Sequence, residues 1–222
     1  MTFPFPTFSP VDATTTAEYT GSGLESPGGS LSSPRTFAGV SVGSADAGRH
    51  VVSAIMLQRT SGSGSPVTGV TIGGVTATKI GSTGLSGHTL EHVAEFWIAA
   101  VPTGTTADVT VAFTGTIFRW AASLFKVLGY SSVHNSATAG TLSANAVSAS
   151  INGRANGCII ACVLNNGVTS YTWTNLTERY DGTAAITFSA ASDNFATAQT
   201  ALSITATQAA NNSPQCIAIV SL

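Results

Sequence analysis

The segment HTLEH, residues 88–92, holds the side chains of this sequence whose types and spacing could do chemistry. His88, Glu91 and His92 match the H-x-x-E-H pattern of a zinc hydrolase motif. On a helix, two histidines four residues apart lie about 6 Å apart on one face and can share a zinc ion. On a strand they lie roughly 13 Å apart, which is too far for one ion whose Zn–N bonds are about 2.0–2.1 Å. The element that carries the segment therefore decides its chemistry.

The sequence around HTLEH favours a strand. Residues 81–88 form a glycine-rich stretch, GSTGLSGH, so we expect His88 at the end of a loop. A second copy of the strand that follows, AAITFSAAS at 184–192, contains neither His nor Glu. A duplicated structural strand explains the position without a metal ion. We therefore reject His88, Glu91 and His92 as a metal site, and we expect neither a cofactor nor an enzyme activity.

An internal duplication organises the chain. Five segments recur in the same order, and their apolar positions match. The paired segments are 46–58 with 153–165, 70–79 with 171–180, 93–104 with 184–195, 108–114 with 201–207, and 118–127 with 213–222. This alignment places Ala54 on Ala161, Trp97 on Phe188, and Val109 on Leu202.

Each of these segments has the pattern of a β-strand. VTVAF (109–113) and LSITAT (202–207) alternate apolar and polar residues. HVVSAIML (50–57) and GCIIACVL (157–164) are continuous apolar runs, as strands buried on both faces require. Gly, Pro and Asn mark the turns between the segments. We predict an all-β fold with almost no helix, a two-sheet, jelly-roll-like sandwich built from two similar halves.

The sandwich is expected to be one domain over residues 36–222, with half-repeats at about 36–128 and 141–222. The alternative is a pair of tandem small sandwiches with residues 129–141 as their linker. We prefer one domain because that stretch is short and lacks proline and charge.

Residues 1–35 are expected to form an extended N-terminal arm. Their sequence is rich in proline and shows no alternation, so the arm cannot bury itself. We expect a neighbouring subunit or a host assembly to order it. Its candidate partner-binding residues are Phe3, Phe5 and Phe8.

Composition excludes several function classes. Only 8% of the residues are charged, against about 25% in ordinary globular proteins, while 43% are hydrophobic and supply a core. The net charge is −2 and the basic residues are scattered, so no patch for nucleic acid is expected. No run of about 18 apolar residues predicts a membrane span. The N-terminal sequence has no basic region, so we expect no signal peptide and synthesis in a bacterial host cytoplasm.

The three cysteines are predicted to be buried, reduced thiols that act as small hydrophobes. Cys158 and Cys162 lie four residues apart in one apolar run, which spans roughly 13 Å on a strand. A disulfide needs Cα atoms within about 7 Å, so these two cannot pair there. A bridge from Cys216 to one of them stays open.

Four stretches resemble a known family. They are AGRHVVSAIML (47–57), AEFWIAAVPTGTTADVTVAFTG (94–115), TWTNLTERYDG (172–182) and FSAAS (188–192). They resemble two-half, jelly-roll-like β-sandwich virion proteins of bacteriophages and prophages, and the similarity covers roughly residues 36–222. The resemblance implies a virion component and carries no catalytic signature.

Two functions follow as expectations. The first is a non-enzymatic structural component of a phage particle, such as a capsid decoration or head-fibre-like protein that stabilises the lattice through its N-terminal arm. Its partners would be major capsid or tail proteins, and we expect a homo-oligomer, with a trimer as the first state to test. The alternative is a tail- or spike-associated glycan-binding module with Tyr171, Trp173 and Tyr180 as its contact surface. A hydrolase is a distant third.

Overall fold

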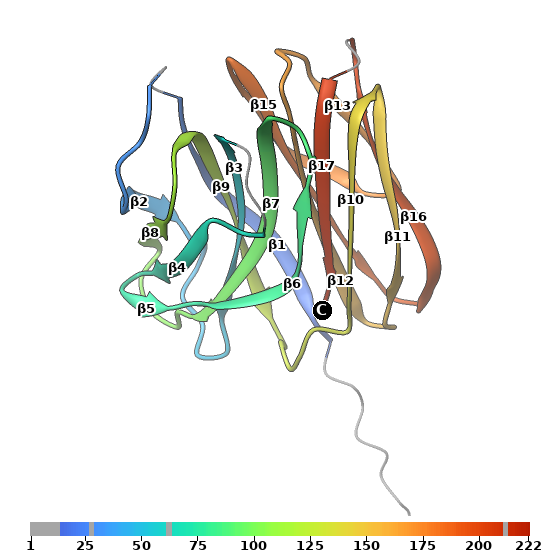
Figure 1. Cartoon of the computed structure of the whole chain (residues 1–222). Coiled ribbons are helices and arrows are strands. Elements are labelled where there is room, and N and C mark those ends of the chain that lie inside the picture. Colours follow the sequence, from blue (N-terminus) through green and yellow to red (C-terminus); the bar gives the residue numbers. More distant parts are fainter. Residues whose placement is uncertain (1–13, 27–28, 61–63, 211–212) are drawn as a thin grey trace, which may run out of the picture.

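The structure, a computed structural model of the whole chain, describes residues 14–26, 29–60, 64–210 and 213–222. Every helix or strand in these residues is a β-strand, as the sequence predicted. In this part of the chain no helix is long and apolar enough to cross a membrane. The strands form four antiparallel sheets that are stacked as layers (Figure 1).

The first half of the chain forms two of these sheets. Its strands are β1 (Thr16–Glu25), β2 (Arg35–Ser41), β3 (His50–Thr60), β4 (Val67–Ile72), β5 (Val75–Thr76), β6 (Thr78–Leu85), β7 (Leu90–Ala100), β8 (Thr106–Phe113) and β9 (Ile117–Leu128). A five-stranded sheet, here the first inner sheet, has the order β1-β9-β3-β7-β6. A four-stranded sheet, the first outer sheet, has the order β2-β8-β4-β5.

The second half forms the other two sheets. Its strands are β10 (Asn135–Ala144), β11 (Ala146–Gly153), β12 (Gly157–Asn165), β13 (Tyr171–Thr174), β14 (Thr177–Ala184), β15 (Ile186–Phe195), β16 (Gln199–Gln208) and β17 (Ser213–Ser221). The second inner sheet has the order β10-β17-β12-β15-β14, and the second outer sheet has the order β11-β16-β13.

The second half repeats the strand order of the first. In the inner sheets β10, β17, β12, β15 and β14 take the places of β1, β9, β3, β7 and β6. In the outer sheets β11, β16 and β13 take the places of β2, β8 and β4. The prediction of an all-β sandwich built from two similar halves is confirmed. Four sheets are present where two were expected, because each half closes a pair of sheets of its own.

Three apolar cores separate the four layers. The central core lies between the two inner sheets and contains Phe96 and Phe125 of the first half with Ile160 and Phe188 of the second. Each of the other two cores lies between the inner and the outer sheet of one half. Equivalent strands make equivalent contacts across the central core, because β6 packs on β10 and β1 on β14. The halves are thus arranged like the subunits of a two-fold dimer.

Strands of the inner sheets are apolar on both faces because each face meets a core. In β3, Ala54 points into the central core and Ile55 into the core of the first half. Ala161, which the sequence alignment places on Ala54, points into the core of the second half. Similarly, Trp97 lies in the core of the first half, whereas Phe188 lies in the central core. The sequence alignment therefore paired the correct strands, but it was out of register, because it matched residues that face the central core with residues that face the core of one half.

The predicted boundary of the N-terminal arm is wrong. Residues 16–25 form β1, an edge strand that pairs with β9 from Thr16 opposite Leu128 to Glu25 opposite Trp120. Only one side chain of β1 is buried, so its sequence shows little of the alternation that marks a strand. The candidate arm residues Phe3, Phe5 and Phe8 lie outside the described residues.

Candidate functional site

The HTLEH segment leads into β7, and its polar side chains have separate surroundings. His88 lies in the bend before β7, where its Nδ1 accepts a hydrogen bond from the Leu90 N–H at 3.2 Å. Glu91 is buried and forms an ion pair with Arg59, with 2.6 Å between Oε2 and Nη2. His92 is fully buried. Among the described residues, no group of three His, Cys, Asp or Glu side chains is placed to bind a metal ion.

Both ring nitrogens of His92 are engaged. Nε2 lies 3.1 Å from Nε2 of Gln58, and Nδ1 lies 3.2 Å from Oγ of Ser86. Gln58 also donates to Oδ1 of Asn166 at 2.9 Å, and the Cys216 thiol donates to the His92 carbonyl at 3.2 Å. Because Asn166 and Cys216 belong to the second half, this network joins the two halves.

The surroundings of His92 keep its ring uncharged. Burial lowers the pKa of His92 from 6.5 to about 3, and the positive charges of His88 and Arg119 act in the same direction. A neutral histidine with both nitrogens occupied has no free position for a metal ion or for a substrate proton. The geometry therefore gives His92 a structural role.

The aromatic residues that the sequence predicts as a contact surface are buried or half-buried. Tyr171 is only 3% exposed, and its hydroxyl donates to Oε1 of Gln215 at 3.0 Å. Trp173 is half-buried, and its Nε1 donates to Oγ of Ser189 at 2.9 Å. Tyr180 is half-buried against the central core. Tyr171 is therefore withdrawn from the candidate surface, since a ligand cannot reach its ring.

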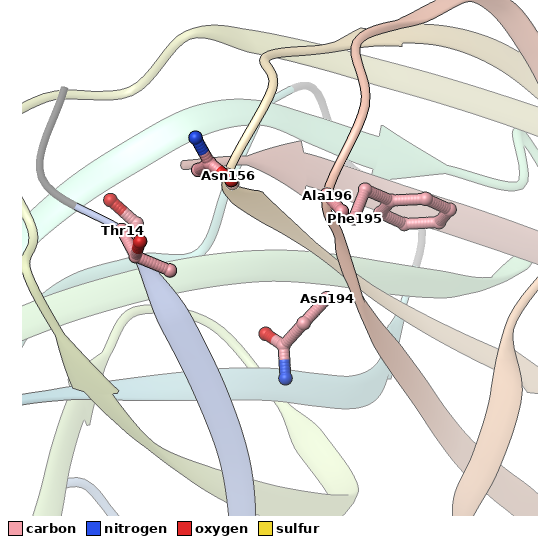
Figure 2. A pocket seen from close by; sticks show the side chains of 7 residues that line it. Thr14, Asn156, Asn194, Phe195 and Ala196 are labelled. Atoms are coloured by element: carbon pink, nitrogen blue, oxygen red, sulfur yellow. The ribbon is translucent and has the colours of Figure 1, made fainter. Parts of the chain in front are cut away.

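A pocket of about 260 Å³ lies where the described chain begins. Its walls come from the start of β1, the turn between β11 and β12, and the end of β15 (Figure 2). In Figure 2 the Asn194 side chain projects from β15 toward β1. The lining residues are Thr14, Thr15, Asn156, Gly157, Asn194, Phe195 and Ala196. Residues 1–13 precede this point in the sequence.

The first described residues are fixed to the second half beside this pocket. The Thr15 N–H donates to the Asn156 carbonyl at 2.7 Å. Asn194 holds the backbone of Ala17 on both sides, since its Oδ1 accepts from the Ala17 N–H at 2.8 Å and its Nδ2 donates to the Ala17 carbonyl at 3.2 Å. The Thr15 hydroxyl donates to the Gly129 carbonyl at 2.9 Å. We call this set the N-terminal junction.

Sequence reasoning missed the N-terminal junction. One signal was present, because Asn156-Gly157 is a dipeptide typical of tight turns, and Asn156 has a positive φ of 55°. No pattern marked Asn194, whose contact with Ala17 spans almost the whole chain. Such contacts arise only when distant strands pack together.

The chain matches no family model, and it matches neither a curated protein nor a solved structure. These comparisons add nothing to the resemblance to phage proteins. Its function must be inferred from its own residues.

Proposed function

We propose that this chain is a non-enzymatic structural component of a phage particle and that residues 1–13 attach it to neighbouring virion proteins. The N-terminal junction is the observation that carries the proposal. Asn156 and Asn194 of the second half hold Thr15 and Ala17, while β1 pairs with β9 of the first half. A load applied to the preceding residues is therefore shared by both halves, as an attachment point requires.

The chemistry of residues 1–13 supports attachment. The segment MTFPFPTFSPVDA contains three phenylalanines and three prolines and a single charged residue, Asp12. Aromatic side chains that fill pockets dominate the binding energy of many interfaces. Proline restricts the backbone and so lowers the entropy that is lost on binding. A capsid or tail protein with apolar pockets is the partner that this segment fits.

The body of the chain suits a subunit of a lattice. Five ion pairs form among its few charged side chains, Arg35–Glu25, Arg59–Glu91, Lys79–Glu95, Lys126–Glu18 and Arg179–Asp193. Its surface offers mainly Ser, Thr, Asn and Gly for contact. Many copies that bind one lattice stabilise it by mass action. The resemblance supplies the phage setting, and the virion is the proposed location.

The proposal is tested on phage particles from the strain that encodes the chain. We expect the chain to band with intact particles in a density gradient. A variant in which Phe3, Phe5 and Phe8 are changed to Ser should remain folded but leave the particle fraction. Recovery of the wild-type chain only at the top of the gradient would refute the proposal.

A matched control removes exposed apolar side chains elsewhere. Leu142 is 55% exposed and Val168 is 65% exposed, and neither belongs to the N-terminal junction. The Leu142→Ser, Val168→Ser variant should band with particles as the wild type does. If it leaves the particles and the phenylalanine variant stays, attachment occurs at another surface.

A further inference from the structure

The two outer sheets carry the same row of hydroxyl groups at equivalent positions. In the first outer sheet, Thr110 of β8 lies opposite Thr36 of β2 on one side and Thr71 of β4 on the other. The row continues to Thr76 of β5, which pairs with Thr71. Thr36 and Thr76 are exposed, and Thr71 and Thr110 are partly exposed. A row of four threonines therefore crosses this sheet.

The second outer sheet repeats the row. Thr205 of β16 lies opposite Ser148 of β11 and Thr174 of β13. These strands are the equivalents of β8, β2 and β4. A hydrogen bond recurs as well, because the hydroxyls of Ser148 and Thr205 lie 2.7 Å apart. The corresponding hydroxyls of Thr36 and Thr110 in the first half lie 2.8 Å apart.

On the second outer sheet the row belongs to a wider hydroxyl face. Neighbouring outward positions are Ser150, Thr172, Ser203 and Thr207, which lie two residues from members of the row. Residues two apart on a strand point to the same side of the sheet, about 6.6 Å apart, and neighbouring strands lie about 4.8 Å apart. The face is therefore a regular grid of hydroxyls.

The charge of this face limits its partner. Strands β11, β13 and β16 contain no Asp, Glu, Lys or Arg, whereas about a quarter or more of an ordinary protein surface is charged. An ionic partner would find no counter-charge here. Among the described residues, the large exposed apolar side chains are Val75, Leu142 and Val168, and none lies on this sheet. A partner that needs a hydrophobic contact would find no anchor either.

We propose that the hydroxyl rows bind a neutral polysaccharide, with the second outer sheet as the stronger site. Each Ser or Thr hydroxyl can donate one hydrogen bond and accept others, and so can each hydroxyl of a sugar. A sugar unit in an extended polysaccharide is similar in length to the spacing between strands. A chain laid across the strands along the row therefore meets one protein hydroxyl for each sugar unit.

Two such faces make the molecule bivalent. The outer sheets lie on opposite sides of the four-layer stack (Figure 1), so one molecule can bind two polysaccharide chains. Retention on a dense polymer surface gains from this arrangement, because the second contact forms at a high effective concentration. This surface is independent of the proposed attachment through residues 1–13.

The test uses the full chain and insoluble polysaccharides. Wild-type protein should be retained on microcrystalline cellulose or on chitin, both uncharged, and should be retained less on the acidic polymer alginate. A variant with Ser148→Ala, Thr174→Val and Thr205→Val removes three hydroxyls and keeps the size and the β-branched shape of both threonines. It should bind about tenfold more weakly or worse, as the loss of two or three hydrogen bonds of ordinary net strength implies. Adding Thr36→Val and Thr110→Val should lower retention further.

The control variant removes hydroxyls from exposed loop residues. Thr89→Val with Thr105→Val should bind as the wild type does, and all variants should unfold at a similar temperature. No retention of the wild type on either neutral polymer would overturn the proposal. Retention that survives the five-residue variant would overturn it too. If the wild type were a dimer in light scattering and that variant a monomer, the rows would be a self-contact and the proposal would fail.

Discussion

The side-chain amide of Gln58 fixes the tautomer of His92. Arg119 donates to Oε1 of Gln58 and has no acceptor atom of its own, so the amide must turn its Nε2 toward His92. Nε2 of the ring then accepts, and the ring proton lies on Nδ1, which faces Oγ of Ser86. Protonation of Nε2 would place two donors against each other. This conflict disfavours the protonated ring of His92, as burial does.

The His92 network predicts that stability falls as the solution becomes more acidic. The unfolded chain binds a proton at His92 below pH 6.5, but the folded chain does so only near pH 3. Between these values the unfolded state holds more protons, so the free energy of unfolding contributed by His92 falls by up to ~1.4 kcal/mol for each pH unit. Above pH 6.5 this contribution is complete.

Urea unfolding of wild type and His92→Gln across this pH range measures the effect. The difference in free energy between the two should shrink as the pH falls. His134→Gln, which removes an exposed imidazole outside this network, is the control. Parallel pH profiles for wild type and His92→Gln would contradict the assignment.

Two glycines allow the halves to approach closely. A Cβ on Gly84 of β6 would lie 2.6 Å from the carbonyl oxygen of Ile217, and one on Gly140 of β10 would collide with the carbonyl of Leu85. We expect Gly84→Ala and Gly140→Ala each to lower the free energy of unfolding by ~1–3 kcal/mol, the usual cost of overpacking.

Chemical denaturation measures this cost, and Gly69→Ala is its control. Gly69 lies in β4, where a Cβ would have no neighbour within 4 Å. If Gly84→Ala and Gly140→Ala unfolded at the same denaturant concentration as Gly69→Ala and the wild type, the contact between β6 and the second inner sheet would be looser than described.

Arg49 links two loops of the first half by hydrogen bonds, the loop before β3 and the loop after β7. Its side chain is almost fully buried and donates to the carbonyls of residues 42–44, 101, 103 and 104, including that of Val101 at 2.6 Å. Lysine cannot reproduce this fork of donors. We expect Arg49→Lys to lower the free energy of unfolding by ~3 kcal/mol, since the buried carbonyls of Val42 and Val101 and several partly buried carbonyls lose hydrogen bonds to a charged donor. Arg154→Lys, which changes an arginine bonded to the exposed Ser132, should cost less than ~1 kcal/mol in the same unfolding assay.

The cysteines should be unreactive in the native protein. All three are free and buried, as predicted. Burial raises the pKa of Cys158 to about 12 and raises the pKa of Cys162 and of Cys216 above the usual thiol value. A maleimide should label none of them at neutral pH and all three after unfolding without reductant, as counted by mass spectrometry. Fast labelling of the folded protein would show that the central core opens readily.

The sequence was sufficient to identify the strands of the five recurring segments and their duplication. In strands such as residues 109–113, apolar and polar residues alternate, and this alternation shows which side chains face solvent. The alignment of Val109 with Leu202 therefore joined equivalent faces, since both residues lie against the core of their own half. Turn residues located the strand ends, and scarce charge with abundant Ser and Thr indicated an all-β fold. These signals are local, and each follows from the contrast between residues that face a core and residues that face solvent.

Only the tertiary structure decided the register of the inner strands, the number of sheets and the place of β1. The middle of a strand such as β3 is buried on both faces and shows no regular alternation of apolar and polar residues, so a shift of one residue exchanges its faces with little change in the pattern. That is why Ala54 was aligned with Ala161. The hydrogen bonds of Asn194 to Ala17, and the pairing of Thr205 with Ser148 and Thr174, join residues that are distant in the sequence. Long-range pairing of this kind depends on how whole sheets pack, and no local pattern encodes it.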